Sequence, residues 1–233
     1  MKLEPVRISV DESCSVAGLL LQPPRAGACY VFAHGAGAGM THRFMADVAD
    51  GLAERDIATL RYQFPYMEKG GGRPDVPAIA RATVRAAVVE AGRRYPDLPL
   101  LAGGKSYGGR MTSEAQALQP LPNVQGLVFF GFPLHQAGKP STERARHLAD
   151  VHVPMLFIQG ARDKLAEPDL IGQVVKALGT NASLYEIAGA DHSLHVPLKS
   201  GGRDADVLAE ALDALVPWFA SMAESGRATP FAE

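Results

Sequence analysis

Strand-like apolar runs alternate with helical segments along most of this chain, and that alternation constrains the fold more than any other feature. Strand, helix and strand in succession indicate a parallel sheet with helices on both faces. Residues 6–10 and 17–22 precede the alternation as two strands joined by a polar turn, which predicts an antiparallel start. We expect a mostly parallel α/β sheet, with strands at 28–34, 57–63, 98–104, 124–131, 154–160 and 182–188, and helices near 41–54, 77–94, 107–118, 143–149, 167–178 and 204–221.

The sequence Gly104-Lys105-Ser106-Tyr107-Gly108 joins one expected strand to the helix that follows it. Strand, sharp turn with a serine at its apex, and helix form the context of the G-x-S-x-G nucleophile elbow. Glycines are needed because flanking side chains would collide with the neighbouring strand or helix. An ordinary helix N-cap is the competing reading of Ser106. We expect the Lys105 side chain to point away from the site.

An acid and a histidine follow in the order that such a nucleophile requires. Asp163 comes just after the strand near 154–160, and His192 just after the strand near 182–188. The order serine, aspartate, histidine is that of the α/β-hydrolase triad, in which histidine takes the serine proton and the carboxylate orients the imidazole. His195 is the alternative base.

A glycine-rich turn, His34 to Gly39, ends the first parallel strand. Such a turn can aim backbone N–H groups at a developing oxyanion. The candidate oxyanion-hole donors are the N–H groups of Ala36 and of Tyr107, the residue after the nucleophile. We expect His34 to pack or hydrogen-bond beneath this turn.

Cofactor and metal signatures are incomplete. A P-loop would need glycine at position 99, where Pro99 stands. A dinucleotide fingerprint would need glycine or alanine at position 40, where Met40 stands. Histidine, cysteine and acidic residues show no metal-ligand spacing. We therefore predict neither a cofactor nor a metal ion.

Two connections should shape access to the site. The glycine-rich loop 64–77 leaves the carboxyl end of a strand, which makes Tyr66 and Arg73 weak candidates for substrate binding. The segment 132–150 is long enough for one short helix but not for a large lid domain. An open, shallow pocket follows, which favours a small or flexible acyl substrate.

The bulk properties fit a single domain over residues 1–223, followed by a frayed tail at 224–233. A net charge of −2 gives no reason to bind nucleic acid or an anionic membrane. The first residues lack the apolar core of a signal peptide, and two cysteines without metal or redox spacing suit a cytoplasmic protein. The oligomeric state stays open.

The segments HGAGAG, GGKSYGGR, GARD and ADHS, in that order, resemble the small α/β-hydrolases of the dienelactone-hydrolase-like kind. The stretch RYQFPY, followed by Gly72-Arg73-Pro74, is similar to a branch that includes a subunit of a histone-acetyltransferase complex. The resemblance covers roughly residues 16–220. It implies an eight-stranded sheet, hydrolysis of esters or related acyl bonds, and Ser106, Asp163 and His192 as the triad. Dienelactone hydrolases proper use cysteine where Ser106 stands, which argues against dienelactone as the substrate.

We therefore predict a serine hydrolase that cleaves a carboxylic ester or related acyl bond of a small molecule through an acyl-enzyme. A binding or scaffold protein on a hydrolase fold is one alternative, because fold alone does not give function. An acyltransferase that uses the same triad is another.

Overall fold

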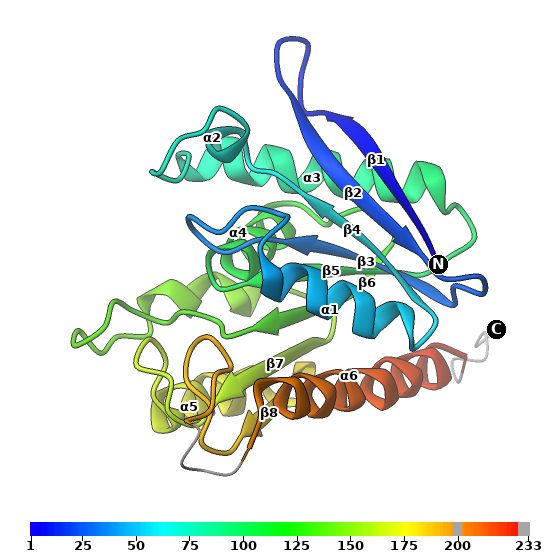
Figure 1. The fold of residues 1–233 in the computed structure, drawn as a ribbon. Coiled ribbons are helices and arrows are strands. Elements are labelled where there is room, and N and C mark those ends of the chain that lie inside the picture. Colours follow the sequence, from blue (N-terminus) through cyan, green and yellow to red (C-terminus); the bar gives the residue numbers. More distant parts are fainter. Residues whose placement is uncertain (198–201, 228–233) are drawn as a thin grey trace, which may run out of the picture.

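The computed structural model describes residues 1–197 and 202–227 and shows an open sheet of eight strands (Figure 1). Neighbouring strands follow the order β1-β2-β4-β3-β5-β6-β7-β8. The β1–β2 and β2–β4 pairs are antiparallel and all the others are parallel, which confirms the predicted sheet. The strands are β1 Lys2–Ser9, β2 Ser15–Gln22, β3 Ala28–Ala33, β4 Ile57–Tyr62, β5 Leu100–Lys105, β6 Val124–Phe130, β7 Met155–Gly160 and β8 Ala182–Ile187.

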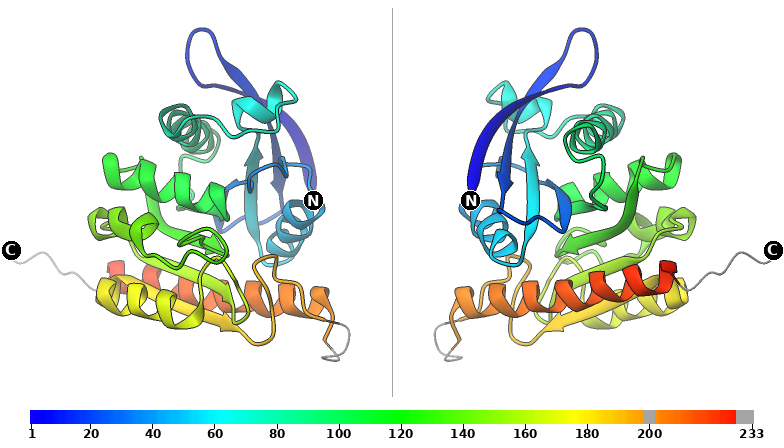
Figure 2. Two further views of the ribbon diagram at one scale, coloured as in Figure 1. Left: turned by 90° about the vertical axis from the view of Figure 1, so that its left-hand side faces the viewer. Right: turned by 90° about the vertical axis from the view of Figure 1, so that its right-hand side faces the viewer.

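Helices cover both faces of the sheet (Figure 2). Buried side chains of α1 and α6 pack on one face, and those of α3, α4 and α5 pack on the other. The α-helices are α1 Arg43–Ala53, α2 Pro65–Glu68, α3 Pro77–Arg94, α4 Tyr107–Leu118, α5 Pro168–Leu178 and α6 Asp204–Arg227, with 3-10 helices η1 Glu143–Asp150 and η2 Gly179–Asn181.

Every residue of β3 is apolar and buried, because both faces of this strand are covered. In β3, Cys29 and Val31 pack toward α3, whereas Tyr30 and Phe32 pack toward α1 and α6. Successive side chains of a strand point to opposite faces, so a strand buried on both sides has no polar alternation. Burying each large apolar side chain stabilises the fold by about 1.5–3 kcal/mol.

Three segments differ from the sequence prediction. The loop 64–77 contains the short helix α2, and the helix expected at 143–149 is the 3-10 helix η1. The helix expected near 204–221 is α6, which runs to Arg227 and continues through Pro217, a residue type that usually kinks or interrupts a helix. The buried face of α6, which includes Leu212 and Leu215, offsets the roughly 3 kcal/mol that a proline costs inside a helix. The predicted tail thus begins within α6, and residues 228–233 lie outside the described residues.

The fold brings the predicted site residues to one edge of the sheet. Parallel strands end at the same side, so the loops after β3, β5, β7 and β8 are neighbours there. These four loops carry all five residues predicted for the triad and the oxyanion hole. Within the described residues, the segment 132–150 contributes the 3-10 helix η1, which packs on α4 and α5, and no large lid domain.

Candidate active site

Ser106 occupies a strained turn between β5 and α4. Its backbone has φ 49° and ψ −114°, and a non-glycine residue with positive φ is uncommon. Strain of this kind costs about 1–3 kcal/mol and persists where the surroundings enforce it. The Ser106 N–H donates to the Phe130 carbonyl at 3.1 Å, and its carbonyl accepts from Arg110 N–H at 3.1 Å. The turn is therefore fixed from both sides.

The two glycines of the pentapeptide are required by the close approach of β3. A Cβ atom on Gly104 would lie 2.4 Å from the Ala33 carbonyl oxygen. A Cβ on Gly108 would lie 2.5 Å from the same oxygen and 2.6 Å from the His34 carbonyl oxygen. All three distances are far below a van der Waals contact, so the predicted reason for these glycines is confirmed.

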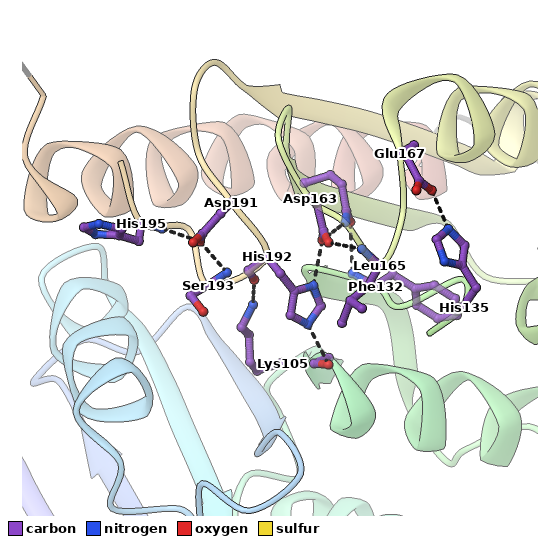
Figure 3. Close-up of polar contacts among 12 residues, drawn as sticks. Lys105, Phe132, His135, Asp163, Leu165, Glu167, Asp191, His192, Ser193 and His195 are labelled. Atoms are coloured by element: carbon purple, nitrogen blue, oxygen red, sulfur yellow. Dashed lines mark hydrogen bonds and ion pairs between the residues drawn. The ribbon is translucent and has the colours of Figure 1, made fainter. Parts of the chain in front are cut away.

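Ser106, His192 and Asp163 form one chain of hydrogen bonds, of which Figure 3 shows the one between His192 and Asp163. His192 Nε2 lies 2.8 Å from Ser106 Oγ, and His192 Nδ1 lies 2.7 Å from Asp163 Oδ2. An ionised carboxylate accepts only, so Nδ1 carries the proton and Nε2 offers its lone pair to the serine hydroxyl. The His192 side chain keeps 22% of its surface exposed, which leaves it within reach of a ligand.

Asp163 is buried, and three donors surround its carboxylate. Besides His192, Gln159 Nε2 donates to Oδ2 at 2.5 Å, and the Leu165 N–H donates to Oδ1 at 2.7 Å. Gln159 is itself held by the Phe132 N–H, which donates to Oε1 at 2.9 Å. The sequence analysis missed Gln159, although a polar residue at the end of the apolar run 154–158 is a signal that could have marked it.

Asp191 shapes the loop that carries His192. Its Oδ1 accepts from the N–H groups of Ser193 at 2.8 Å and His195 at 3.1 Å, which folds the chain tightly around the histidine. His195, the alternative base, instead places Nδ1 2.9 Å from Asp204 Oδ2. The Asp204 carboxylate raises the pKa of His195. The structure therefore brings His192, and not His195, to Ser106.

The turn after β3 lies against the elbow with open donors. Within the described residues, the N–H groups of Ala36 and Tyr107 donate to no protein acceptor. A Cβ on the neighbouring Gly35 would lie 3.9 Å from Ser106 Cβ, which puts the turn beside the serine. Two unpaired N–H groups flanking a serine hydroxyl can hold a negatively charged oxygen.

His34 holds this turn from beneath, as expected. Its Nδ1 donates to the Gly35 carbonyl at 2.7 Å, and its Nε2 accepts from the Phe64 N–H at 3.1 Å. Both bonds require a neutral ring, because Nε2 must keep its lone pair. Burial lowers the pKa of His34 to about 4, which keeps the ring neutral at physiological pH.

The two weak candidates on the loop 64–77 have different surroundings. Tyr66 is 5% exposed, and its hydroxyl accepts from the Gly37 N–H at 2.9 Å. Its own N–H donates to Asp75 Oδ2 at 3.0 Å, and the Tyr107 hydroxyl donates to the Asp75 carbonyl at 3.3 Å. Tyr66 therefore braces the turn after β3. Arg73 is exposed and forms no hydrogen bond within the described residues, so the structure does not draw it to Ser106.

Across residues 1–197 and 202–227, no three histidine, cysteine or acidic side chains gather in a way that could hold a metal ion. Over that part of the chain, no helix is both long and apolar enough to cross a membrane.

The family described as an alpha/beta hydrolase domain matches residues 26–220. The chain belongs to this family. Among solved structures, this alpha/beta hydrolase is similar to a dienelactone hydrolase from Anabaena variabilis, with 22% identity, a TM-score of 0.73, and coverage of 91% of this chain and 95% of that one. It is also similar to a serine hydrolase without a lid from Xanthomonas campestris, with 19% identity, a TM-score of 0.69, and coverage of 93% and 96%.

A third solved structure holds a ligand. Est1E from Butyrivibrio proteoclasticus with bound ferulic acid is 17% identical, has a TM-score of 0.68, and covers 88% of this chain and 96% of its own. Identities this low show a shared fold and carry no information about the substrate of the present alpha/beta hydrolase.

Proposed function

We propose that this protein is a serine hydrolase that cleaves a carboxylic ester or a related acyl bond through an acyl-enzyme. The observation that supports it most strongly is the pair of hydrogen bonds from Ser106 Oγ to His192 and from His192 to Asp163. A serine hydroxyl is a weak nucleophile at neutral pH, and this relay supplies the base that activates it.

In the first step, Ser106 Oγ bonds to the acyl carbon while His192 Nε2 takes the hydroxyl proton. The electron pair of the carbonyl moves to its oxygen, and the N–H groups of Ala36 and Tyr107 stabilise that oxyanion. Asp163 stabilises the imidazolium that forms. Losing one oxyanion donor typically costs about a hundred- to a thousandfold in rate.

In the second step, the carbonyl re-forms and the bond to the leaving group breaks. His192 returns its proton to the departing oxygen, so an alcohol leaves and the acyl group stays on Ser106. A water molecule then gives a proton to His192 and attacks the acyl carbon. Ser106 departs from the carbon and regains its proton, and a carboxylic acid is released. The cycle consumes one water.

The substrate we propose is a small or flexible ester or thioester. The short segment 132–150 leaves the sheet edge open, so little protein surface is available to enclose a long acyl chain. On the loop 64–77, the exposed Arg73 is the proposed contact for the rest of the substrate, whereas the buried Tyr66 acts by bracing the turn after β3. Both cysteines are free, which fits the cytoplasmic location that we propose.

Labelling with an active-site-directed fluorophosphonate tests the proposal, with Ser106→Ala as the variant and Ser113→Ala, on the same helix, as the matched control. We expect the wild type and Ser113→Ala to be labelled and Ser106→Ala not to be. Equal labelling of all three proteins, or none, would favour a binding or scaffold role. A panel of short and medium acyl p-nitrophenyl esters then gives chain-length preference, and product analysis with added alcohols or amines separates a hydrolase from an acyltransferase.

A further inference from the structure

Lys105 is the last residue of β5 and precedes Ser106 directly. The expectation that its side chain points away from the site is wrong. Its Nζ instead donates a hydrogen bond to the backbone carbonyl oxygen of His192 (Figure 3). The residue before the serine thus contacts the main chain of the residue that carries the base.

The rest of the Lys105 side chain runs through the junction of several loops. Its Cγ would lie 3.6 Å from a Cβ placed on Gly35, in the turn after β3. Its Nζ is 5.4 Å from the ring centroid of Phe44 at the start of α1. A Cβ on Gly131, just after β6, would lie 2.7 Å from Nζ and 2.9 Å from the His192 carbonyl oxygen. Packing around the ammonium group is therefore tight on several sides.

An ammonium group in such a place is costly. Within the described residues Lys105 forms no ion pair, although buried charges are normally paired. Its hydrogen-bond acceptor is a neutral carbonyl, and the Phe44 ring adds a cation–π contact. A methionine of similar length would fill the same space without the desolvation cost, so packing alone does not explain a lysine here.

We propose that Lys105 is a positioning residue that fixes the His192 loop over Ser106 by holding the His192 carbonyl. This inference rests on the proposed function, because it assigns a role to Lys105 in the same reaction. The His192 ring is held by Asp163 at one nitrogen, and Lys105 holds the backbone from which that ring projects. Misplacing a catalytic group by about 1 Å can cost about a hundredfold in rate.

The charge of Lys105 makes the anchor sensitive to pH. The charged and titratable groups that face it are Asp163 after β7, and Asp191 and His192 after β8, while α1 presents the uncharged Phe44. Burial lowers the pKa of Lys105 to about 8, and the two carboxylates partly oppose that shift. The ammonium is therefore present below about pH 8, and above it a neutral amine, a weaker donor, replaces it.

The test compares Lys105→Met with Lys176→Met, a change of an exposed lysine on α5. For Lys105→Met we expect kcat on a short acyl ester to fall about ten- to a hundredfold with KM within about twofold of the wild type. The rate of fluorophosphonate labelling should fall in parallel, and Lys176→Met should match the wild type. In the wild type, kcat should decline across pH 8, and Lys105→Met should lack that decline.

Hydrogen exchange of the amides of Ser193, Leu194 and His195, measured by mass spectrometry, reports the anchor without any substrate. These amides bond to Asp191 within the His192 loop and should exchange faster in Lys105→Met. If the fluorophosphonate does not label the wild type, but the His192 loop exchanges faster in Lys105→Met, the proposed function is wrong and the anchoring role of Lys105 still holds. If the fluorophosphonate labels the wild type, and Lys105→Met has the same kcat and the same rates of amide hydrogen exchange, the proposed role of Lys105 is wrong.

Lys105→Arg continues the test if Lys105→Met does not fold. A guanidinium stays charged far above pH 8, so the decline in kcat near pH 8 should disappear from this variant. A decline that stays near pH 8 in Lys105→Arg would contradict the proposal, because another group would then be titrating.

Discussion

The Asp163 side and the oxyanion side of the site differ in how their polar groups are satisfied. Asp163 is 1% exposed, and His192, Gln159 and Leu165 all donate to it. On the other side, the N–H groups of Ala36 and Tyr107 have no protein acceptor within the described residues. The acceptor side is thus satisfied by the protein itself, and on the proposed function the donor side is left free for the oxyanion that forms during the reaction.

Changing Asp163 to asparagine should produce the largest effect. The neutral amide places an N–H donor where the carboxylate has only acceptors, so His192 Nδ1 would accept a hydrogen bond there in place of donating one. The favoured tautomer of His192 would change, and we expect kcat to fall about 10⁴-fold. Steady-state kinetics on a short acyl ester measures it. Asp213→Asn, in the surface pair with Arg55, is the control. A loss of less than about tenfold would show that Asp163 does not orient His192.

Lowering the pH should destabilise the folded protein through His34, the residue beneath the turn after β3. The pKa of His34 is lowered from 6.5 to about 4 in the folded protein, so the unfolded chain binds the proton first as pH falls. Stability is therefore full above about pH 6.5 and declines toward pH 4, by on the order of 3 kcal/mol from this group. Denaturant titrations at several pH values measure it, and His34→Gln should flatten the decline. An equally steep decline in that variant would count against His34.

Removing the amide behind Asp163 should have an intermediate effect. Gln159→Leu leaves the Phe132 N–H without its acceptor and deprives Asp163 of one donor. We expect a loss of about 1–3 kcal/mol in stability and a fall of about tenfold or more in kcat. Gln116→Leu is a matched control, since Gln116 is also buried and accepts from a loop N–H, but lies at the far end of α4. If the two variants lose kcat equally, Gln159 has no special link to the site.

Tyr66→Phe should have the smallest effect. It removes the acceptor of the Gly37 N–H and keeps the ring, so the turn after β3 loses one neutral hydrogen bond worth about 1 kcal/mol. We expect kcat to fall several-fold. The fall would reach about tenfold if the full energy of the hydrogen bond from Gly37 N–H to Tyr66 stabilises the transition state. Tyr185→Phe, in the exposed bond to Glu210, is the control. An unchanged kcat with raised KM would point to Tyr66 as a substrate contact instead.

The sequence predicted what lies at the ends of apolar strands. Ser106, Asp163 and His192 each follow such a run, and parallel strands must end at one edge, so their convergence could be predicted without coordinates. Residues whose partners are main-chain atoms could not be found in this way. The acceptor of Lys105 is a carbonyl and the donors to Asp191 are backbone N–H groups, and no residue pattern marks either.

The sequence prediction also failed for a very short helix and for a helix in which packing offsets the cost of a proline. Pro65 follows Phe64 at a position suited to the first turn of a helix, but α2 has four residues and shows no periodicity. Pro217 indicated a break in the last helix that packing on the sheet overrides. The polar residue at the end of the apolar run 154–158 marks Gln159 as unusual, but its role depends on its bonds to Asp163 and Phe132, which lie on adjacent loops.

The modest size of the segment between β6 and β7 has a kinetic consequence. On the proposed function, the described residues between β6 and β7, with η1 as their helix, provide no lid domain that must open before product leaves. Turnover would then be governed by bond making and breaking at Ser106, and added glycerol or sucrose, which slows diffusion and large chain movements, should barely alter it.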